Sequence, residues 1–267
     1  MHLPHQEAFP PAAAIAQEKS GIHGASAGRT RRIPLVDAMR GAAIVAMVIY
    51  HLAWDLSYFG FVAVNVQVDR GWTIFARSIA GTFMLLVGVS LVLAHHGGFQ
   101  PRPFLHRLAV VLAAAALVTL VTWYLFPTSF VFFGILHAIA VSSVLALPFL
   151  RLPLTLVVVG GAFALAAPSL LAGPVFDAPW LWWLGLMSFT PTSNDYVPIF
   201  PWFGLVLAGT VATRLLLRLT ARQDRLHWSS PPFKPLVWIG RHSLVIYLLH
   251  QPALFGSLSL LHQVVGL

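Results

Sequence analysis

The sequence contains no cysteine and few charged residues. The absence of cysteine from all 267 residues excludes disulfide bonds, thiolate metal sites and a cysteinyl acyl intermediate. Asp, Glu, Lys and Arg make up only 9% of the chain, against about 25% in typical soluble domains. Hydrophobic residues make up 58%. We therefore interpret the chain as a polytopic membrane protein whose length is divided among several helices.

Acidic residues are the scarcer of the two charge types, and the formal net charge is +8. This excess does not indicate a nucleic-acid partner, because the positive residues sit in short loops between apolar runs, as in cytoplasmic anchoring. The N-terminal stretch has no apolar run of signal-peptide length. We expect a disordered cytoplasmic tail over residues 1–33 and a transmembrane domain over residues 34–267.

Apolar runs of about 20 residues predict an all-α transmembrane helix bundle of about seven spans in membrane lipid. An eleven-residue piece at 179–189 is too short to span, and its tryptophans favour an interfacial or re-entrant segment. Arginine-bearing loops alternate with loops that carry almost none, which predicts a cytoplasmic N-terminus. The predicted spans are 36–58, 71–94, 106–126, 130–149, 153–172, 197–218 and 235–256.

The first predicted span carries four ionisable residues on one face. Arg40 and His51 are eleven residues apart, about 16 Å of helical rise, and eleven steps of about 100° return them to the same side. Asp55 lies one turn beyond His51, and Asp37 lies nearly one turn before Arg40. Ionisable residues inside a membrane span are costly, and this stripe therefore indicates a functional site.

The stripe has a catalytic interpretation and a structural one. A carboxylate at i+4 holds an imidazole in one tautomer, which suits His51 and Asp55 to general-base chemistry. Arg40, near the cytoplasmic surface, suits a phosphate-bearing donor. Structural interpretations stay open: an ion pair of Arg40 with Asp37, an interhelical hydrogen bond for His51, and a solvated helix end for Asp55.

Three later segments add candidates. His137 in GILHAIA lines an acceptor or acyl pocket, or is a buried histidine bonded to the backbone. Asp195, before YVPIFPWFG, binds sugar hydroxyls or caps a helix. Arg241, at the start of the last predicted helix, binds an anion or anchors the chain. His250 and Gln251 suit interhelical hydrogen bonding. Twelve histidines form no metal-binding motif, and we expect no metal site.

These residues resemble a known family. VDAMRG, followed by nine residues and then His51, is similar to the first-helix pattern of integral-membrane acyltransferases. That superfamily includes the O-acyltransferases of bacterial surface glycans and the catalytic domain of heparan-alpha-glucosaminide N-acetyltransferase. The chain is most similar to an uncharacterised bacterial branch related to the second enzyme, over about residues 33–256. Further matching phrases are YHLAWDL (50–56), FGILHAIA (133–140), DYVPIFPWFG (195–204) and GRHSLVIYLLHQP (240–252).

The resemblance implies transmembrane acyl transfer. Acetyl-CoA, or another short acyl-CoA, would bind from the cytoplasm with its phosphates near Arg40, and Arg241 would be a second phosphate contact. The acyl group would pass to a sugar or glycan hydroxyl or amine on the other side of a bacterial inner membrane, with His51 as the base. The heparan enzyme has asparagine at the position of His51 and its catalytic histidine in the next loop. The 59–72 loop here has no histidine, so the heparan substrate does not carry over.

Two other classes of function compete with an enzyme. A proton-coupled transporter also uses intramembrane His, Asp and Arg, but such transporters commonly consist of two related halves, and the sequence has no internal repeat. A membrane scaffold without chemistry does not need an ionisable stripe on one helix face. Neither the acceptor, the acyl length nor the oligomeric state follows from the sequence.

Overall fold

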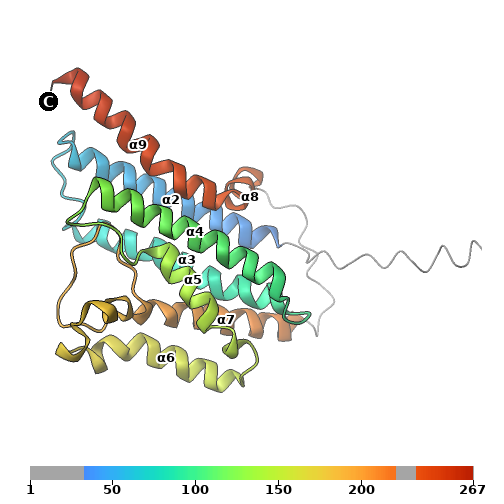
Figure 1. The fold of residues 1–267 in the computed structure, drawn as a ribbon. Helices are drawn as coiled ribbons and strands as arrows, with labels where there is room; N and C mark the ends of the chain where they lie inside the picture. The colour runs from blue at the N-terminus through green and yellow to red at the C-terminus, as the bar shows by residue number, and fades with distance from the viewer. Residues whose placement is uncertain (1–32, 221–232, 267) are drawn as a thin grey trace, which may run out of the picture. The chain divides into compact units, whose positions relative to one another are not determined.

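The computed structural model describes residues 33–220 and 233–266, and this part of the chain is mostly helical (Figure 1). Residues 1–32 of the expected tail lie outside it. The α-helices are α2 (Pro34–Tyr58), α3 (Arg70–His95), α4 (Pro101–Leu125), α5 (Ile135–Leu145), α6 (Leu154–Leu171), α7 (Ile199–Thr220), α8 (Lys234–Arg241) and α9 (Ser243–Val265). The 3-10 helices are η1 (Pro148–Leu150), η2 (Pro174–Phe176) and η3 (Pro179–Leu184).

Six of the described helices are long and apolar enough to cross a membrane: α2, α3, α4, α6, α7 and α9. This confirms the expected all-α transmembrane bundle. The 179–189 piece does not span, since it forms η3 and an irregular turn. Trp180 there is 75% exposed, which suits an interfacial position.

The fourth predicted span is shorter than expected. Instead of a helix over 130–149, the structure has α5 with 11 residues, or about 16 Å of rise. The chain before it is extended and pairs with the segment before α7. Asn194 donates its backbone N–H to Ser129 (2.8 Å), and Val197 donates to Phe133 (3.1 Å). Non-helical backbone is tolerated at membrane depth only where protein satisfies its polar groups, and these bonds do so.

The last predicted span, 235–256, is two helices rather than one. The short α8 ends at Arg241, and the backbone departs from helical geometry at His242 (φ −103°, ψ 17°) before α9 begins. One face of α8 is polar, with Lys234 and Arg241, and the helix packs along the first turns of α2. The membrane-spanning part of this region is therefore α9, which ends nine residues later than predicted.

Two groups of packed helices are joined by contacts between α2 and α3, and α4 packs against α5. In the first, α7 packs against α3 and α6, with Met84, Val157 and Leu207 in a shared core. In the second, α2 packs against α8 and α9. Phe83 and Tyr247 contact the apolar clusters of both groups. Most of the polar contacts described below join α2 to α8 and α9.

Candidate functional site

One end of the domain carries an arginine cluster around a single carboxylate. Arg40 donates from Nη1 to Asp37 Oδ1 (2.9 Å) and from Nη2 to Ser90 Oγ of α3 (3.0 Å). Arg241, 204 positions away in the sequence, donates from Nε to the other oxygen of Asp37 (3.5 Å). Asp37 is only 8% exposed. The two arginines predicted to bind the donor are thus brought together by α8 packing on α2.

A third arginine joins this cluster. Arg107 lies in the second turn of α4, which begins at Pro101. Its positive charge interacts with that of Arg40. In the part of the chain that the structure describes, Arg107 has no hydrogen bond or ion pair, and it is exposed. Three arginines against one aspartate leave an excess of positive charge, which favours an anion.

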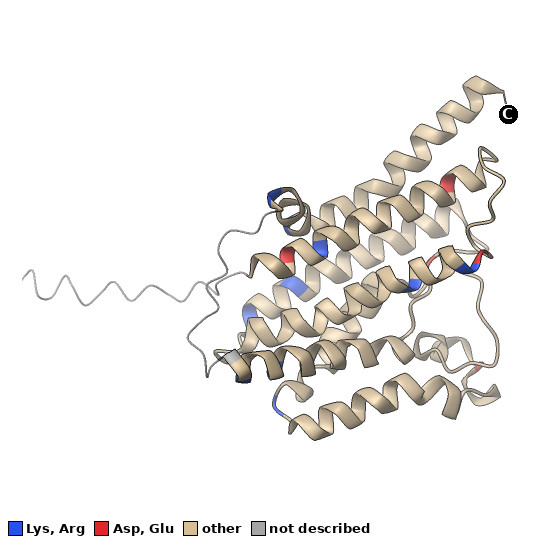
Figure 2. Ribbon diagram, turned by 180° about the vertical axis from the view of Figure 1, so that it is seen from behind, with Lys and Arg blue, Asp and Glu red and all other residues tan. Residues whose placement is uncertain are grey.

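The distribution of charge over the whole domain agrees with this position. Figure 2 shows that most Lys and Arg residues lie toward the end of the bundle where α2 begins. Cytoplasmic ends of membrane helices carry such an excess. This distribution agrees with the cytoplasmic position predicted for the arginine-rich end from the sequence.

Further along α2, two histidines from different helices lie side by side. The rings of His51 and His250, the latter on α9, have centroids 4.9 Å apart with a 58° angle between their planes. The Nδ1 of His250 lies 2.6 Å from the carbonyl oxygen of Tyr247. Both side chains are partly buried. The sequence identified His250 only as an interhelical hydrogen-bonding residue, because nothing in it shows which helix α9 faces.

Asp55 has a different partner from the one expected. Its Oδ1 accepts a hydrogen bond from Gln251 Nε2 of α9 (2.8 Å), and no hydrogen bond joins it to His51 within residues 33–220 and 233–266. The side chain is 0% exposed, so it is not a solvated helix end. The i+4 spacing brings Asp55 and His51 to the same face, but the amide on the neighbouring helix binds the carboxylate instead.

His137 and Asp195 also lie close together, at the first turn of α5. Asp195 Oδ2 accepts from the backbone N–H of Ile135 (2.9 Å). His137 Nδ1 accepts from the N–H of Gly134 (3.2 Å), and its Nε2 lies 3.3 Å from Thr119 Oγ1 of α4. Asp195 therefore caps a helix, as one interpretation of the sequence held, but the helix is α5 rather than α7, which follows it.

Asp195 is partly buried, and burial affects its ionisation. Burial raises the pKa of its carboxyl to about 6, although the hydrogen bond from Ile135 acts in the opposite direction. The side chain nevertheless keeps part of its surface accessible. Its charge also interacts with the phenols of Tyr50 and Tyr247, which belong to α2 and α9. Asp195 is thus close to the elements that carry the histidine pair.

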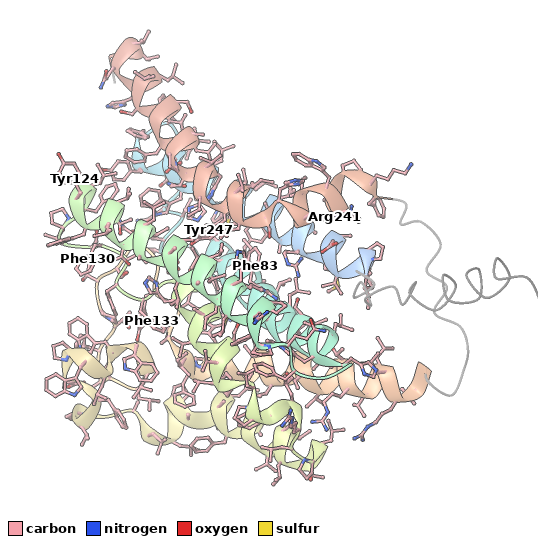
Figure 3. The ribbon with its side chains drawn as sticks, turned by 45° about the vertical axis from the view of Figure 1, so that its right-hand side comes forward. Phe83, Tyr124, Phe130, Phe133, Arg241 and Tyr247 are labelled. Atoms are coloured by element: carbon pink, nitrogen blue, oxygen red, sulfur yellow. The ribbon has the colours of Figure 1, made fainter. Side chains whose placement is uncertain are left out.

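Aromatic side chains mark the line between the arginine cluster and the opposite end. In Figure 3, Arg241 lies toward one end, Phe83 and Tyr247 lie midway, Phe133 lies beyond them, and Tyr124 and Phe130 lie at the other end. Tyr247 contacts all three apolar clusters of the domain and lies 5.8 Å, ring to ring, from His250. Arg241, Tyr247 and Phe133 thus follow one another along the bundle. His250 lies beside Tyr247, and His137 lies 5.7 Å, ring to ring, from Phe133.

No metal centre is formed by the described residues. They contain no group of three or more His, Asp or Glu side chains placed to hold an ion. The chemistry available to this site is that of arginines, imidazoles and carboxylates: anion binding, hydrogen bonding and proton transfer.

Comparison with known proteins adds one match. Residues 32–252 match the family model described as "Heparan-alpha-glucosaminide N-acetyltransferase, catalytic". No curated protein and no solved structure matches the chain. The matched range begins just before α2 and ends within α9, so it contains every candidate residue described above.

Proposed function

We propose that this chain, which belongs to the heparan-alpha-glucosaminide N-acetyltransferase catalytic family, moves an acetyl or other short acyl group across a membrane. The donor is a cytoplasmic acyl-CoA, and the acceptor is a hydroxyl or amine of a sugar or glycan on the extracytoplasmic side. The chain is an integral membrane protein, and six helices of its described part are long and apolar enough to span. We place it in the inner membrane of a bacterium, with an envelope glycan as the acceptor.

The arrangement of charge along α2 carries this proposal. Arg40 lies at the arginine-rich end, and His51 lies eleven residues further, about 16 Å along the helix axis. A phosphate-bearing head bound at the first position can extend its acyl end toward the second. Arginine forms charge-assisted hydrogen bonds with phosphate, and Arg107 has no protein partner that competes for it among the described residues.

The acceptor site lies on the other side of the histidine pair. Asp195 and His137 meet at the start of α5, and Asp195 keeps accessible surface. A carboxylate and an imidazole are both suited to hydrogen bonds with sugar hydroxyls. An acceptor held there approaches the thioester from the side opposite to the coenzyme. The family relative's own acceptor is not assumed, because position 51 and the 59–72 loop differ from the pattern of that enzyme.

Acyl transfer in this chain is direct. The acceptor oxygen or nitrogen attacks the thioester carbonyl carbon, and its proton passes to an imidazole of the His51 and His250 pair. The carbon–sulfur bond then breaks and coenzyme A leaves as the thiol. The sequence contains no cysteine to carry the acyl group. Exclusion of water around the pair protects the thioester from hydrolysis.

Calorimetric titration of the detergent-solubilised protein with acetyl-CoA tests the proposal. Wild type should show saturable binding, and R40A and R241A should each weaken it by about 10- to 100-fold, the effect of losing a charge-assisted hydrogen bond. H51A should bind nearly as wild type, because His51 contacts the acyl end and not the phosphates. R102A, which removes an exposed arginine from the first turn of α4, is the matched control and should bind normally.

Absence of binding by folded wild-type protein would overturn the proposal. It would direct attention to proton-coupled transport, the other function for which buried His and Asp side chains are suited. Equal weakening by R102A and R40A would show that only the overall positive charge matters, and not the cluster around Asp37.

A further inference from the structure

The two histidines of the pair differ in how their rings are held. His250 Nδ1 is 2.6 Å from the Tyr247 carbonyl oxygen, which accepts only, so the proton of a neutral His250 is on Nδ1. The lone pair is then on Nε2. For His51, no hydrogen bond to either ring nitrogen is found within the described ranges. The orientation and tautomer of His250 are therefore fixed by the protein, and those of His51 are not.

The free nitrogen of His250 is buried without a partner. Its Nε2 has essentially no accessible surface, and no hydrogen bond reaches it from the described part of the chain. Asp55 Oδ2 and Gln251 Oε1, on the same two helices, are in the same condition. Buried polar atoms are nearly always paired, so unpaired ones in a native structure indicate a bound molecule or a catalytic role. Three unpaired buried atoms on neighbouring residues of α2 and α9 therefore indicate a binding or catalytic site at this position.

The neighbouring imidazole of His51 affects whether the His250 ring can hold a second proton. The ring of His51 lies 4.9 Å away. Two imidazolium ions that close repel each other, so a proton gained by one ring disfavours a proton on the other. One ring of the pair is then the base, while the other stays neutral and available as a hydrogen-bond donor.

We propose that His250 Nε2 takes the proton from the acceptor, with His51 donating a hydrogen bond to the thioester carbonyl oxygen. This inference rests on the proposed acyl transfer and assigns the base to a residue of α9 rather than to the predicted His51. The fixed Nδ1–H and the unpaired Nε2 are what a general base requires. Gln251, through its bond to Asp55, is a positioning residue that ties α9 to α2 beside the base.

In this step one proton moves from the acceptor to coenzyme A by way of His250. The acceptor O–H or N–H bond breaks as its heteroatom bonds to the acyl carbon, and the proton moves to His250 Nε2. Collapse of the tetrahedral intermediate breaks the carbon–sulfur bond, and the electron pair stays on sulfur. The thiolate then takes the proton from Nε2, which leaves a neutral imidazole, free coenzyme A and the acylated acceptor.

Steady-state kinetics on the full chain test the assignment. Acetyl-CoA serves as donor and glucosamine as the probe acceptor, with released coenzyme A measured by a thiol reagent to which the cysteine-free protein contributes no background. H250Q should lower kcat by about 100-fold or more, with the KM for acetyl-CoA within about threefold of wild type. H95Q is the matched control, since His95 has the same type of bond, from Nδ1 to the Leu91 carbonyl (2.8 Å), far from the pair. It should keep wild-type kcat.

A second measurement, which does not depend on catalysis, is NMR of protein whose histidine ring nitrogens are isotopically labelled. The His250 signals, assigned by their loss in H250Q or H250N, should show a protonated Nδ1 and a bare Nε2, and acetyl-CoA should shift the Nε2 resonance. A kcat for H250Q within about threefold of wild type would overturn the proposal. So would the opposite tautomer, or an Nε2 resonance that saturating acetyl-CoA leaves unchanged.

Failure of this inference can be told apart from failure of the proposed function. Protein that does not bind acetyl-CoA at all would contradict both. Protein that binds acetyl-CoA and loses turnover in H51Q but not in H250Q would keep the acyltransferase and return the base to His51. If the protein binds acetyl-CoA but does not acylate glucosamine, the NMR measurement still tests the assignment of His250 as the base.

Discussion

At the scale of single residues, burial and the neighbouring helix end have opposite effects on the pKa of the Asp195 carboxyl. The first turn of α5 and the N–H of Ile135 favour a negative charge there, but burial is the larger effect and raises the pKa of the carboxyl from its ordinary 3.8 to about 6. The folded protein therefore binds a proton at Asp195 more tightly than the unfolded chain does. The consequence is a stability that depends on pH in a defined window.

We expect stability to fall as pH rises from about 4 to about 6. Across this window the unfolded chain has released the Asp195 proton while the folded protein still holds it, so deprotonation favours unfolding. Two units of pKa correspond to at most about 3 kcal/mol. D195N should remove this dependence, measured as the difference between its thermal unfolding midpoint and that of wild type at each pH. Parallel midpoint curves for the two proteins would contradict it.

D69N is the matched control for this measurement. Asp69 also caps a helix, accepting from Trp72 N–H (3.1 Å) at the start of α3, but it is exposed. Asparagine caps a helix about as well as aspartate does. The D69N midpoint should therefore follow wild type through the same pH window, which separates the effect of burial from that of capping.

The ion pair of Arg40 with Asp37, one interpretation of the sequence, is confirmed, but contacts between distant helices were not predictable. The cost of a charge in lipid was enough to identify Arg40, His51 and Asp55 as residues of interest. The partners of His51 and Asp55 come from α9, about two hundred positions away, and no periodicity within one helix shows which other helix it faces. This is why Asp55 was expected beside His51 and is bound instead by Gln251.

At the scale of helices, close backbone contact between α2 and α8 holds the arginine cluster together. A side chain at Gly41 would overlap the carbonyl oxygen of Leu236, and one at Gly240 would overlap that of Asp37. Backbones approach this closely only where small residues permit it. Arg241, next to Gly240, therefore owes its place beside Asp37 to the two glycines.

We expect G240A to separate α8 from α2 and weaken the acyl-CoA site. The added methyl group meets backbone atoms that have no side-chain freedom to yield, so the helix must shift and carry Arg241 away from Asp37. Acetyl-CoA affinity should fall by about tenfold, the order expected for one weakened charge-assisted bond, in a calorimetric titration. G256A in α9, where nothing lies within 4 Å of the added atom, is the control and should bind as wild type. Unchanged affinity in a folded G240A protein would show that α8 does not shape the donor site.

Hydropathy placed α2, α3, α6 and α7 within two residues of their observed bounds, but it did not locate α5. The apolar run 130–149 is long enough for a span, yet only Ile135–Leu145 forms an α-helix. The reason is tertiary: the preceding segment exchanges backbone hydrogen bonds with the chain before α7, and Asp195 caps α5 from that same segment. Hydropathy counts apolar residues but does not show whether backbone groups are paired within a helix or between two extended segments.

At the scale of the whole transmembrane domain, the shortness of α5 raises the question of how many times the chain crosses the membrane. If α5 and the extended residues before it cross together, α4 and α6 run in opposite senses to α5 and the total is seven. If they do not cross, the segments after α4 and after α6 lie on opposite sides. Thr128 and Val175, both exposed, lie in these two segments. Their sidedness therefore decides between seven crossings and six.

We expect single cysteines at Thr128 and Val175 to face the same, extracytoplasmic side, and one at Gln100 to face the cytoplasm. The cysteine-free sequence needs no prior substitution for such a test. A membrane-impermeant maleimide added to intact cells should label T128C and V175C, whereas Q100C should react only after the membrane is opened. This pattern places the arginine cluster on the cytoplasmic side and Asp195 toward the opposite side, as donor and acceptor require. Labelling of Q100C and V175C from the same side would instead mean that α5 does not cross, and the proposed direction of transfer would fail with it.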